Sequence, residues 1–350
     1  MKYAGKEDPL SWDIAYAIHK VIDESNVYKY DEHIKLQFSL ICAMIDRLRD
    51  SVCFFNDLDG APKTDGELYL FLVHSCMIHD AVKKIHEELG LKYKYEEGAG
   101  NAEYKYFRPV ISDEMLKVAH GKNFPTDEKF FEYFRSLAFA HPLDTNRPRF
   151  FEKGEKRYSP FVINASGPVV EAESEQMIGV RVYSNKWPEI NDLYFPFRSW
   201  MDFIKDRYEL LIGVNNHIKG IVENKESEWC QKKLNRKLST SELLRAMVGQ
   251  LEIRYVSSHV LASTKEALAY YTMPLDTFTA RTVESVVKYR AAIDSSIQRL
   301  CEALDDLDYE SFMDILDPIV CPRPPSPEGY CGVDYQLEKI FNHFGDNDEC

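Results

Sequence analysis

Hydrophobic residues recur at intervals of three and four along most of the chain, which is the pattern of amphipathic helices. The clearest stripe lies between about residues 30 and 58, and its members are Ile34, Phe38, Ile41, Ile45, Leu48, Val52 and Phe55. Further helices are predicted over residues 8–25, 64–90, 112–120 and 126–141. We therefore expect residues 1–150 to form a helical domain.

Two of these helices carry clear start signals. Thr64 and Glu67 have the spacing of a capping box, in which each side chain satisfies the backbone N–H of the other residue. Thr126 can cap the helix over 126–141, and the carboxylates of Asp127 and Glu128 then lie at the positive end of its dipole. Pro142 disfavours helical geometry for the residue before it, so this helix should end at His141.

The pattern changes between residues 158 and 197. Three segments there, Tyr158–Asn164, Met177–Ser184 and Asp192–Phe197, are rich in β-branched and aromatic residues and are separated by Gly, Pro and Asn. Such segments favour a small antiparallel sheet of about three strands. A helix is predicted to follow from about residue 198 to 215, which completes a second region over residues 151–215.

Residues 216–320 form a third region, which is again helical. A capping box at Ser239 and Glu242 opens a helix that should reach Tyr271. The next helix, over 283–304, alternates apolar residues three and four apart, with Arg290 inside the stripe. This stripe can pack within the chain, as one side of a helical hairpin, or across a dimer. A proline-rich connector and tail occupies residues 321–350.

The composition excludes several classes of protein. Because 57 acidic residues outnumber 43 basic ones, for a net charge of −14, a broad surface that coats nucleic acid is not expected. The eight cysteines form no Cys-x-x-Cys pair, so they are interpreted as reduced thiols. No signal peptide and no apolar run of about 18 residues is found, so we expect a cytoplasmic protein without a membrane partner.

One short motif suggests chemistry, namely Arg135-Ser-Leu-Ala-Phe-Ala-His141. Six basic and three acidic residues lie between Arg135 and Tyr158, so this stretch is locally positive in an acidic chain. Such a stretch favours a site for a phosphate-bearing ligand, to which Arg147 and Arg149 could add contacts. The alternative is an ordinary solvated helix end.

The helix over 64–90 supplies the other candidates. Asp80 could orient Arg135 or His141 across a helix pair. Alternatively, it could be solvent-exposed or pair with Lys83 or Lys84 of its own helix. The histidines at 74, 79 and 86 are five and seven residues apart, a poor spacing for a metal site. Neither a metal nor another cofactor is therefore predicted.

The helical start, the segment Leu48–Asn56 and the stretch from Phe131 to Pro142 resemble the HEPN superfamily over about residues 10–150. The resemblance implies a HEPN-type helical bundle. With the strand and helix patterns described above, the expected fold is mainly α, with a small antiparallel β insertion and a C-terminal helical hairpin. Many members are metal-independent ribonucleases of toxin, CRISPR and anti-phage systems, in which the 2′-hydroxyl of RNA attacks the adjacent phosphate.

The resemblance also assigns roles to residues of the motif. Arg135 would bind the scissile phosphate and His141 would transfer protons. Ser136, at a position where the family commonly has Asn, Asp or His, would assist by hydrogen bonding. Since one chain supplies a single copy of the motif, a homodimer is implied, with RNA as substrate and an antitoxin or another defence-system protein as a possible partner.

Two alternatives remain open. Ser136 favours an inactive HEPN-like module that binds RNA or a nucleotide without turnover. The apolar stripe over 283–304 and the acidic composition would instead suit a helical adaptor or antitoxin-like interaction protein.

Overall fold

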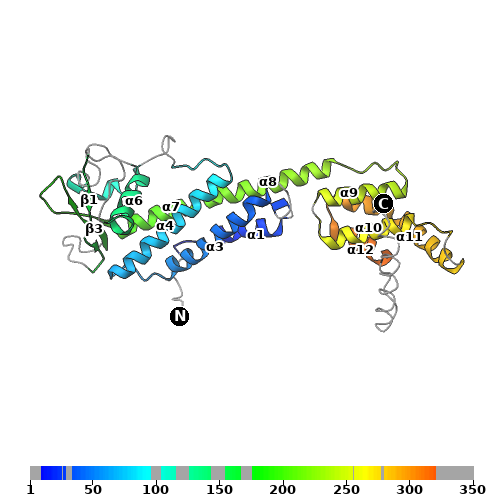
Figure 1. Ribbon diagram of the computed structural model, residues 1–350, viewed down its shortest axis with the longest axis horizontal. Helices are drawn as coiled ribbons and strands as arrows, with labels where there is room; N and C mark the ends of the chain where they lie inside the picture. Colours follow the sequence, from blue (N-terminus) through cyan, green and yellow to red (C-terminus); the bar gives the residue numbers. More distant parts are fainter. Residues whose placement is uncertain are drawn as a thin grey trace, which may run out of the picture. The chain divides into compact units, whose positions relative to one another are not determined.

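A computed structural model describes residues 9–25, 27–28, 34–95, 104–115, 126–142, 154–166, 176–254, 256–276 and 280–320. The chain divides into two compact units (Figure 1). Unit 1 comprises Met1–Ile22 and Leu36–Ile218, and unit 2 comprises Asp23–Lys35 and Lys219–Cys350. The regions 1–150 and 151–215, which the sequence suggested as separate, thus belong almost entirely to one unit.

Unit 1 is built mainly from helices. In chain order they are α1 (Trp12–Glu24), α3 (Lys35–Asp57), α4 (Asp65–Glu88), the 3-10 turn η1 (Arg108–Val110), α6 (Asp127–Arg135), the π-helical turn η2 (Ser136–Ala140), α7 (Phe197–Glu209) and the start of α8 (Leu211–Gln231). The capping box of Thr64 and Glu67 is confirmed, and Thr126 caps α6 as predicted. Residues 113–115 are helical, and the rest of the helix predicted to residue 120 lies outside the described residues.

Aromatic rings fill the core of unit 1. Trp200 of α7 is fully buried, and the ring centroids of Phe131 and Phe134 from α6 lie 5.1 and 5.2 Å from it. Phe107 and Phe195 approach the same indole at 5.7 and 5.8 Å. The motif helix α6 is therefore held in place by the apolar face that it turns toward α7, since closely packed rings leave it little freedom.

The sheet is antiparallel and belongs to the same unit. Its strands are β1 (Arg157–Tyr158), β2 (Val162–Ile163), β3 (Met177–Ser184) and β4 (Asn191–Pro196), and β3 pairs with the other three. The first predicted strand is thus split in two. Pro160 lies at the interruption, and proline has no N–H to donate to a ladder.

Two predicted helices near and beyond the sheet differ from the structure. The helix expected over 198–215 ends at Glu209, and α8 begins at Leu211 and runs to Gln231. The helix expected from Ser239 to Tyr271 is two helices, α9 (Thr240–Ile253) and α10 (Ser258–Thr272). Arg254 lies at the break, fully buried, and its guanidinium donates to the carbonyls of Trp229 and Leu304. These bonds reach other segments of unit 2, so local sequence patterns did not reveal them.

Unit 2 packs α9 and α10 against α11 (Ala280–Asp305) and α12 (Tyr309–Val320). The last part of the heptad stripe, Ile293, Ile297, Leu300 and Leu304, is buried against residues of α9 and α12. That part therefore packs within the chain, in a cluster of helices rather than a simple hairpin. The proline-rich residues 321–350 lie outside the described residues.

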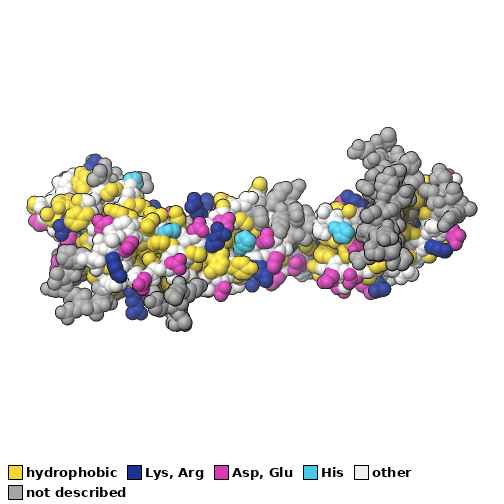
Figure 2. All heavy atoms as spheres, turned by 90° about the horizontal axis from the view of Figure 1, so that it is seen from below, with side chains coloured by type: hydrophobic (Ala, Val, Ile, Leu, Met, Phe, Trp, Pro, Cys, Tyr) yellow, Lys and Arg dark blue, Asp and Glu magenta, His cyan; other side chains and the backbone are white. Residues whose placement is uncertain are grey.

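The surface of the described residues mixes charge signs. On the face that Figure 2 presents, lysine and arginine side chains are interspersed with acidic and hydrophobic ones. Among the described helices, none is both long enough and apolar enough to cross a membrane.

Candidate functional site

Arg135 is the last residue of α6, and it reaches across to α4. Its Nη1 donates to Oδ2 of Asp80 at 3.2 Å, so the expected contact between these two side chains is present. The alternative partner Lys84 pairs instead with Glu87 and Glu88. Burial alone would raise the pKa of Asp80, but the positive charges of His79 and Arg135 outweigh it, so this pKa is lowered.

The turn after Arg135 is wider than an α-helical turn. The N–H of His141 donates to the carbonyl of Ser136 at 2.8 Å, an i to i+5 bond. His141 then leaves helical geometry, with φ −143° and ψ 55°, as Pro142 led us to expect, and its side chain is exposed. Ser136 is only 6% exposed, so little of this residue is accessible from the surface.

One basic residue of the stretch after the motif, Arg157, is withdrawn from the surface. Arg157 is 1% exposed, and its guanidinium donates to Glu155 at 2.9 Å and to the hydroxyl of Tyr133 at 2.8 Å. The ring of Trp187 lies 4.6 Å from the same guanidinium. Arg157 is therefore part of the packing of β1. Arg147 and Arg149, the other predicted phosphate contacts, lie outside the described residues.

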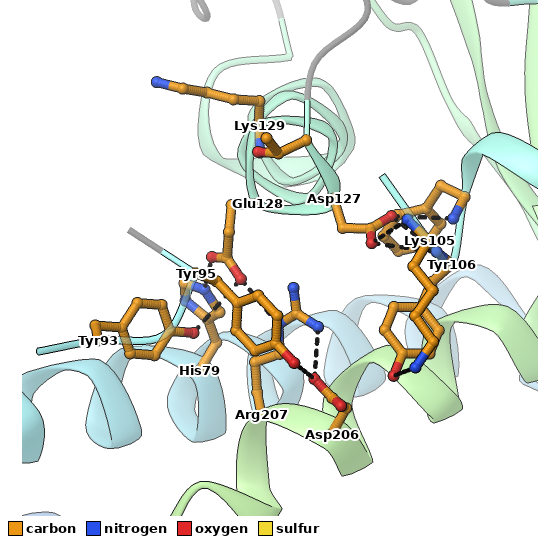
Figure 3. A network of polar contacts seen from close by, with 12 residues as sticks. His79, Tyr93, Tyr95, Lys105, Tyr106, Asp127, Glu128, Lys129, Asp206 and Arg207 are labelled. Atoms are coloured by element: carbon orange, nitrogen blue, oxygen red, sulfur yellow. Dashed lines mark hydrogen bonds and ion pairs between the residues drawn. The ribbon is translucent and has the colours of Figure 1, made fainter. Parts of the chain in front are cut away.

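Figure 3 shows a buried polar network around His79, Glu128 and Arg207 in the interior of unit 1. His79 also links this network to the Asp80–Arg135 pair. His79 contacts Asp80 through Nδ1 at 3.1 Å and Glu128 through Nε2 at 2.5 Å. Arg207 of α7 donates to the other oxygen of Glu128 at 2.8 Å and to Asp206 at 3.0 Å. These contacts connect α4, α6 and α7 in one continuous chain.

The charges along this chain alternate in sign. Burial would lower the pKa of His79, but its hydrogen bonds to Asp80 and Glu128 outweigh that effect, so the pKa is raised. Burial would likewise raise the pKa of Glu128, but His79 and Arg207 together lower it. With His79 protonated, positive and negative groups follow one another from Arg135 to Asp206. Each buried charge thus has an opposite neighbour, which offsets its loss of hydration.

The sequence by itself indicates other roles for two members of this network. Its local pattern marks Glu128 only as a helix-dipole residue and His79 only as a candidate metal ligand. A signal was available, because His79 shares the buried face of α4 with Ile78 and Val82, and Arg207 lies among the buried residues of α7. A charged side chain within an apolar helical stripe indicates a buried partner.

Two hollows flank the motif. One is a groove of about 700 Å³ between α3 and α4, lined by apolar residues such as Leu40, Met44 and Met77 and including Asp80. The other, of about 410 Å³, lies beside the turn that carries His141. Phe139, which lies between Arg135 and His141 in the sequence, lines both.

Comparison of the chain with family models, with curated proteins and with solved structures found no match. Within the described residues, no group of three or more His, Cys, Asp or Glu is arranged to hold a metal ion.

Proposed function

We propose that this protein is a metal-independent endoribonuclease of the HEPN type, acting as a toxin or a host-defence effector. One observation carries the proposal: an arginine paired with a carboxylate ends the same helix whose next turn presents an exposed histidine. Helical packing and an adjoining hollow support it further. These features are what acid–base chemistry on a phosphodiester requires.

The reaction follows from the two side chains. His141 removes the proton of a ribose 2′-hydroxyl, whose oxygen then forms a bond to the adjacent phosphorus. The bond from phosphorus to the 5′ oxygen breaks, and that oxygen takes up a proton from the His141 of a second copy of this chain. The products are a 2′,3′-cyclic phosphate and a 5′-hydroxyl. Arg135 stabilises the added negative charge of the transition state, and Asp80 positions Arg135.

A second chain completes the site in this proposal. One His141 cannot remove and deliver a proton in the same step, whereas a symmetric pair of motifs supplies two histidines and two arginines. We expect a dimer by light scattering. Mixing wild type with excess His141→Ala chain, under conditions that allow exchange, should reduce cleavage beyond simple dilution. A monomer that cleaves RNA at full rate would contradict the composite site.

The deciding experiment measures cleavage of total RNA by purified protein in excess chelator. His141→Ala and Arg135→Ala should each reduce the rate by about 100-fold or more. His259→Ala is the matched control, because His259 is also an exposed histidine but lies in unit 2. Cleavage that survives both motif substitutions, or that requires Mg²⁺ and leaves 5′-phosphates, would refute the proposal.

A second candidate function is a module that binds RNA or a nucleotide without cleaving it. The burial of Ser136 and the neutralisation of Arg135 by Asp80 favour this candidate, since both reduce the groups available for catalysis. This candidate would be supported if the wild-type protein bound RNA oligomers tightly and left them intact, both as a monomer and as a dimer.

A further inference from the structure

Three of the residues that line the hollow of about 410 Å³ near His141 are aromatic, namely Tyr69 of α4, Phe139 of the motif turn and Phe161 from the segment between β1 and β2. Ala138, Pro142, Ser159 and Pro160 complete the lining. All of these residues belong to unit 1.

Backbone hydrogen bonds connect the segment Ser159–Phe161, which lines the hollow, to the motif turn and to β3. The N–H of Ser159 donates to the carbonyl of Pro142 at 2.7 Å, and the N–H of Arg181 in β3 donates to the carbonyl of Phe161 at 3.2 Å. The lining of the hollow is therefore hydrogen-bonded to Pro142, the residue that follows His141. The part of a ligand that extends from this hollow would lie next to the motif turn.

Two of the aromatic side chains are exposed although the core of unit 1 is rich in buried rings. Phe161 is 43% exposed and Tyr69 is 38% exposed. The guanidinium of Arg181, paired with Asp192 at 2.7 Å, lies 5.0 Å from the centroid of Phe161. Two exposed rings thus line a concave surface, and exposed aromatic rings can stack on a planar ligand.

We propose that this hollow binds one unpaired nucleobase of an RNA whose phosphate lies at Arg135 and His141. The identity of the ligand as RNA rests on the proposed function. The volume falls within the range of small-molecule sites, and bases of single strands stack on aromatic side chains in this way. A base-paired duplex could not offer a base to this hollow, so the site selects single-stranded or looped RNA. In this proposal, Tyr69 and Phe161 are substrate-binding residues.

The test measures binding, not cleavage. A fluorescein-labelled trinucleotide with 2′-O-methyl riboses has no hydroxyl to attack phosphorus, and its affinity is read by fluorescence anisotropy. Phe161→Ala and Tyr69→Ala should each weaken binding by about 5- to 150-fold, the range for loss of one stacked base. Phe161→Tyr and Tyr69→Phe should restore it. Tyr16→Ala is the control, since Tyr16 is 52% exposed and lies on α1.

Trinucleotides with an abasic position identify the stacked base. At one of the three positions, removal of the base should lower the affinity of wild type by as much as the substitution Phe161→Ala does. Removal of the same base should not lower the affinity of the Phe161→Ala variant any further. Equal affinity of Phe161→Ala and wild type, equal losses in Tyr16→Ala, or no binding by wild type would overturn the proposal. Far-ultraviolet circular dichroism verifies that each variant is folded.

Failure of this inference can be told apart from failure of the ribonuclease proposal. If His141→Ala abolishes cleavage while Phe161→Ala leaves both affinity and KM unchanged, the base site is wrong and the ribonuclease stands. If wild type never cleaves RNA but loses oligomer binding through Phe161→Ala, the base site stands and the ribonuclease is wrong.

Discussion

Glu128→Ala should destabilise unit 1 strongly, because the carboxylate of Glu128 lies at the centre of the buried network. It accepts hydrogen bonds from His79 at 2.5 Å, from Arg207 at 2.8 Å and from the hydroxyl of Tyr93 at 3.4 Å. The side chain of Arg207 is 1% exposed and that of His79 is 4% exposed, so neither can regain water when the carboxylate is removed. Loss of one partner from a buried ion pair costs about 3–5 kcal/mol.

Two features place the expected cost near the lower end of that range. Arg207 keeps Asp206 at 3.0 Å, and His79 keeps Asp80 at 3.1 Å, so neither positive charge is left wholly uncompensated. We therefore expect a loss of about 3 kcal/mol, which corresponds to about 6–12 °C in Tm for a unit of this size.

Urea unfolding monitored by tryptophan fluorescence provides the assay. Trp229 lies in unit 2 and the other three tryptophans in unit 1, so a Trp229→Phe background reports on unit 1. Glu132→Ala is the matched control, because Glu132 is exposed and lies one turn further along α6. A difference of less than about 1 kcal/mol between the two variants would contradict a central role for Glu128, because helix-dipole effects alone could produce it.

Three further outcomes are expected. The folded-state pKa of His79 is raised above its ordinary value of 6.5. The stability that protonated His79 contributes is therefore complete below pH 6.5 and is lost as the pH rises through the folded-state pKa. Urea unfolding at several pH values should show this loss in wild type but not in His79→Gln. Gly179→Ala should lower the unfolding free energy by about 1–3 kcal/mol in the same assay, since an added Cβ would lie 2.3 Å from the carbonyl oxygen of Leu193. Leu300→Ala should lower the free energy of unfolding of unit 2 by about 2–5 kcal/mol, because Leu300 is fully buried. Val287→Ala, at a position that is 51% exposed, should change it by less than about 1 kcal/mol. Fluorescence of Trp229 during urea unfolding measures both changes.

Local signals in the chain were enough to predict most helices of the fold. The stripe from Ile41 to Phe55 is buried along α3, and the capping boxes at Thr64 and Ser239 start α4 and α9 where they were expected. Such signals succeed because a cap or an apolar stripe acts within one or two helical turns. Pro142 likewise forecast the end of helical geometry at His141.

The tertiary structure decided where distant segments meet. The break at Arg254 depends on carbonyls of Trp229 and Leu304, and the network around Glu128 depends on side chains from three helices. The burial of Ser136 and the hollow next to the motif turn likewise depend on packing between distant segments. Spacing along a sequence specifies which face of a helix a residue occupies, but packing between elements determines whether that face meets a carboxylate, a ring or water.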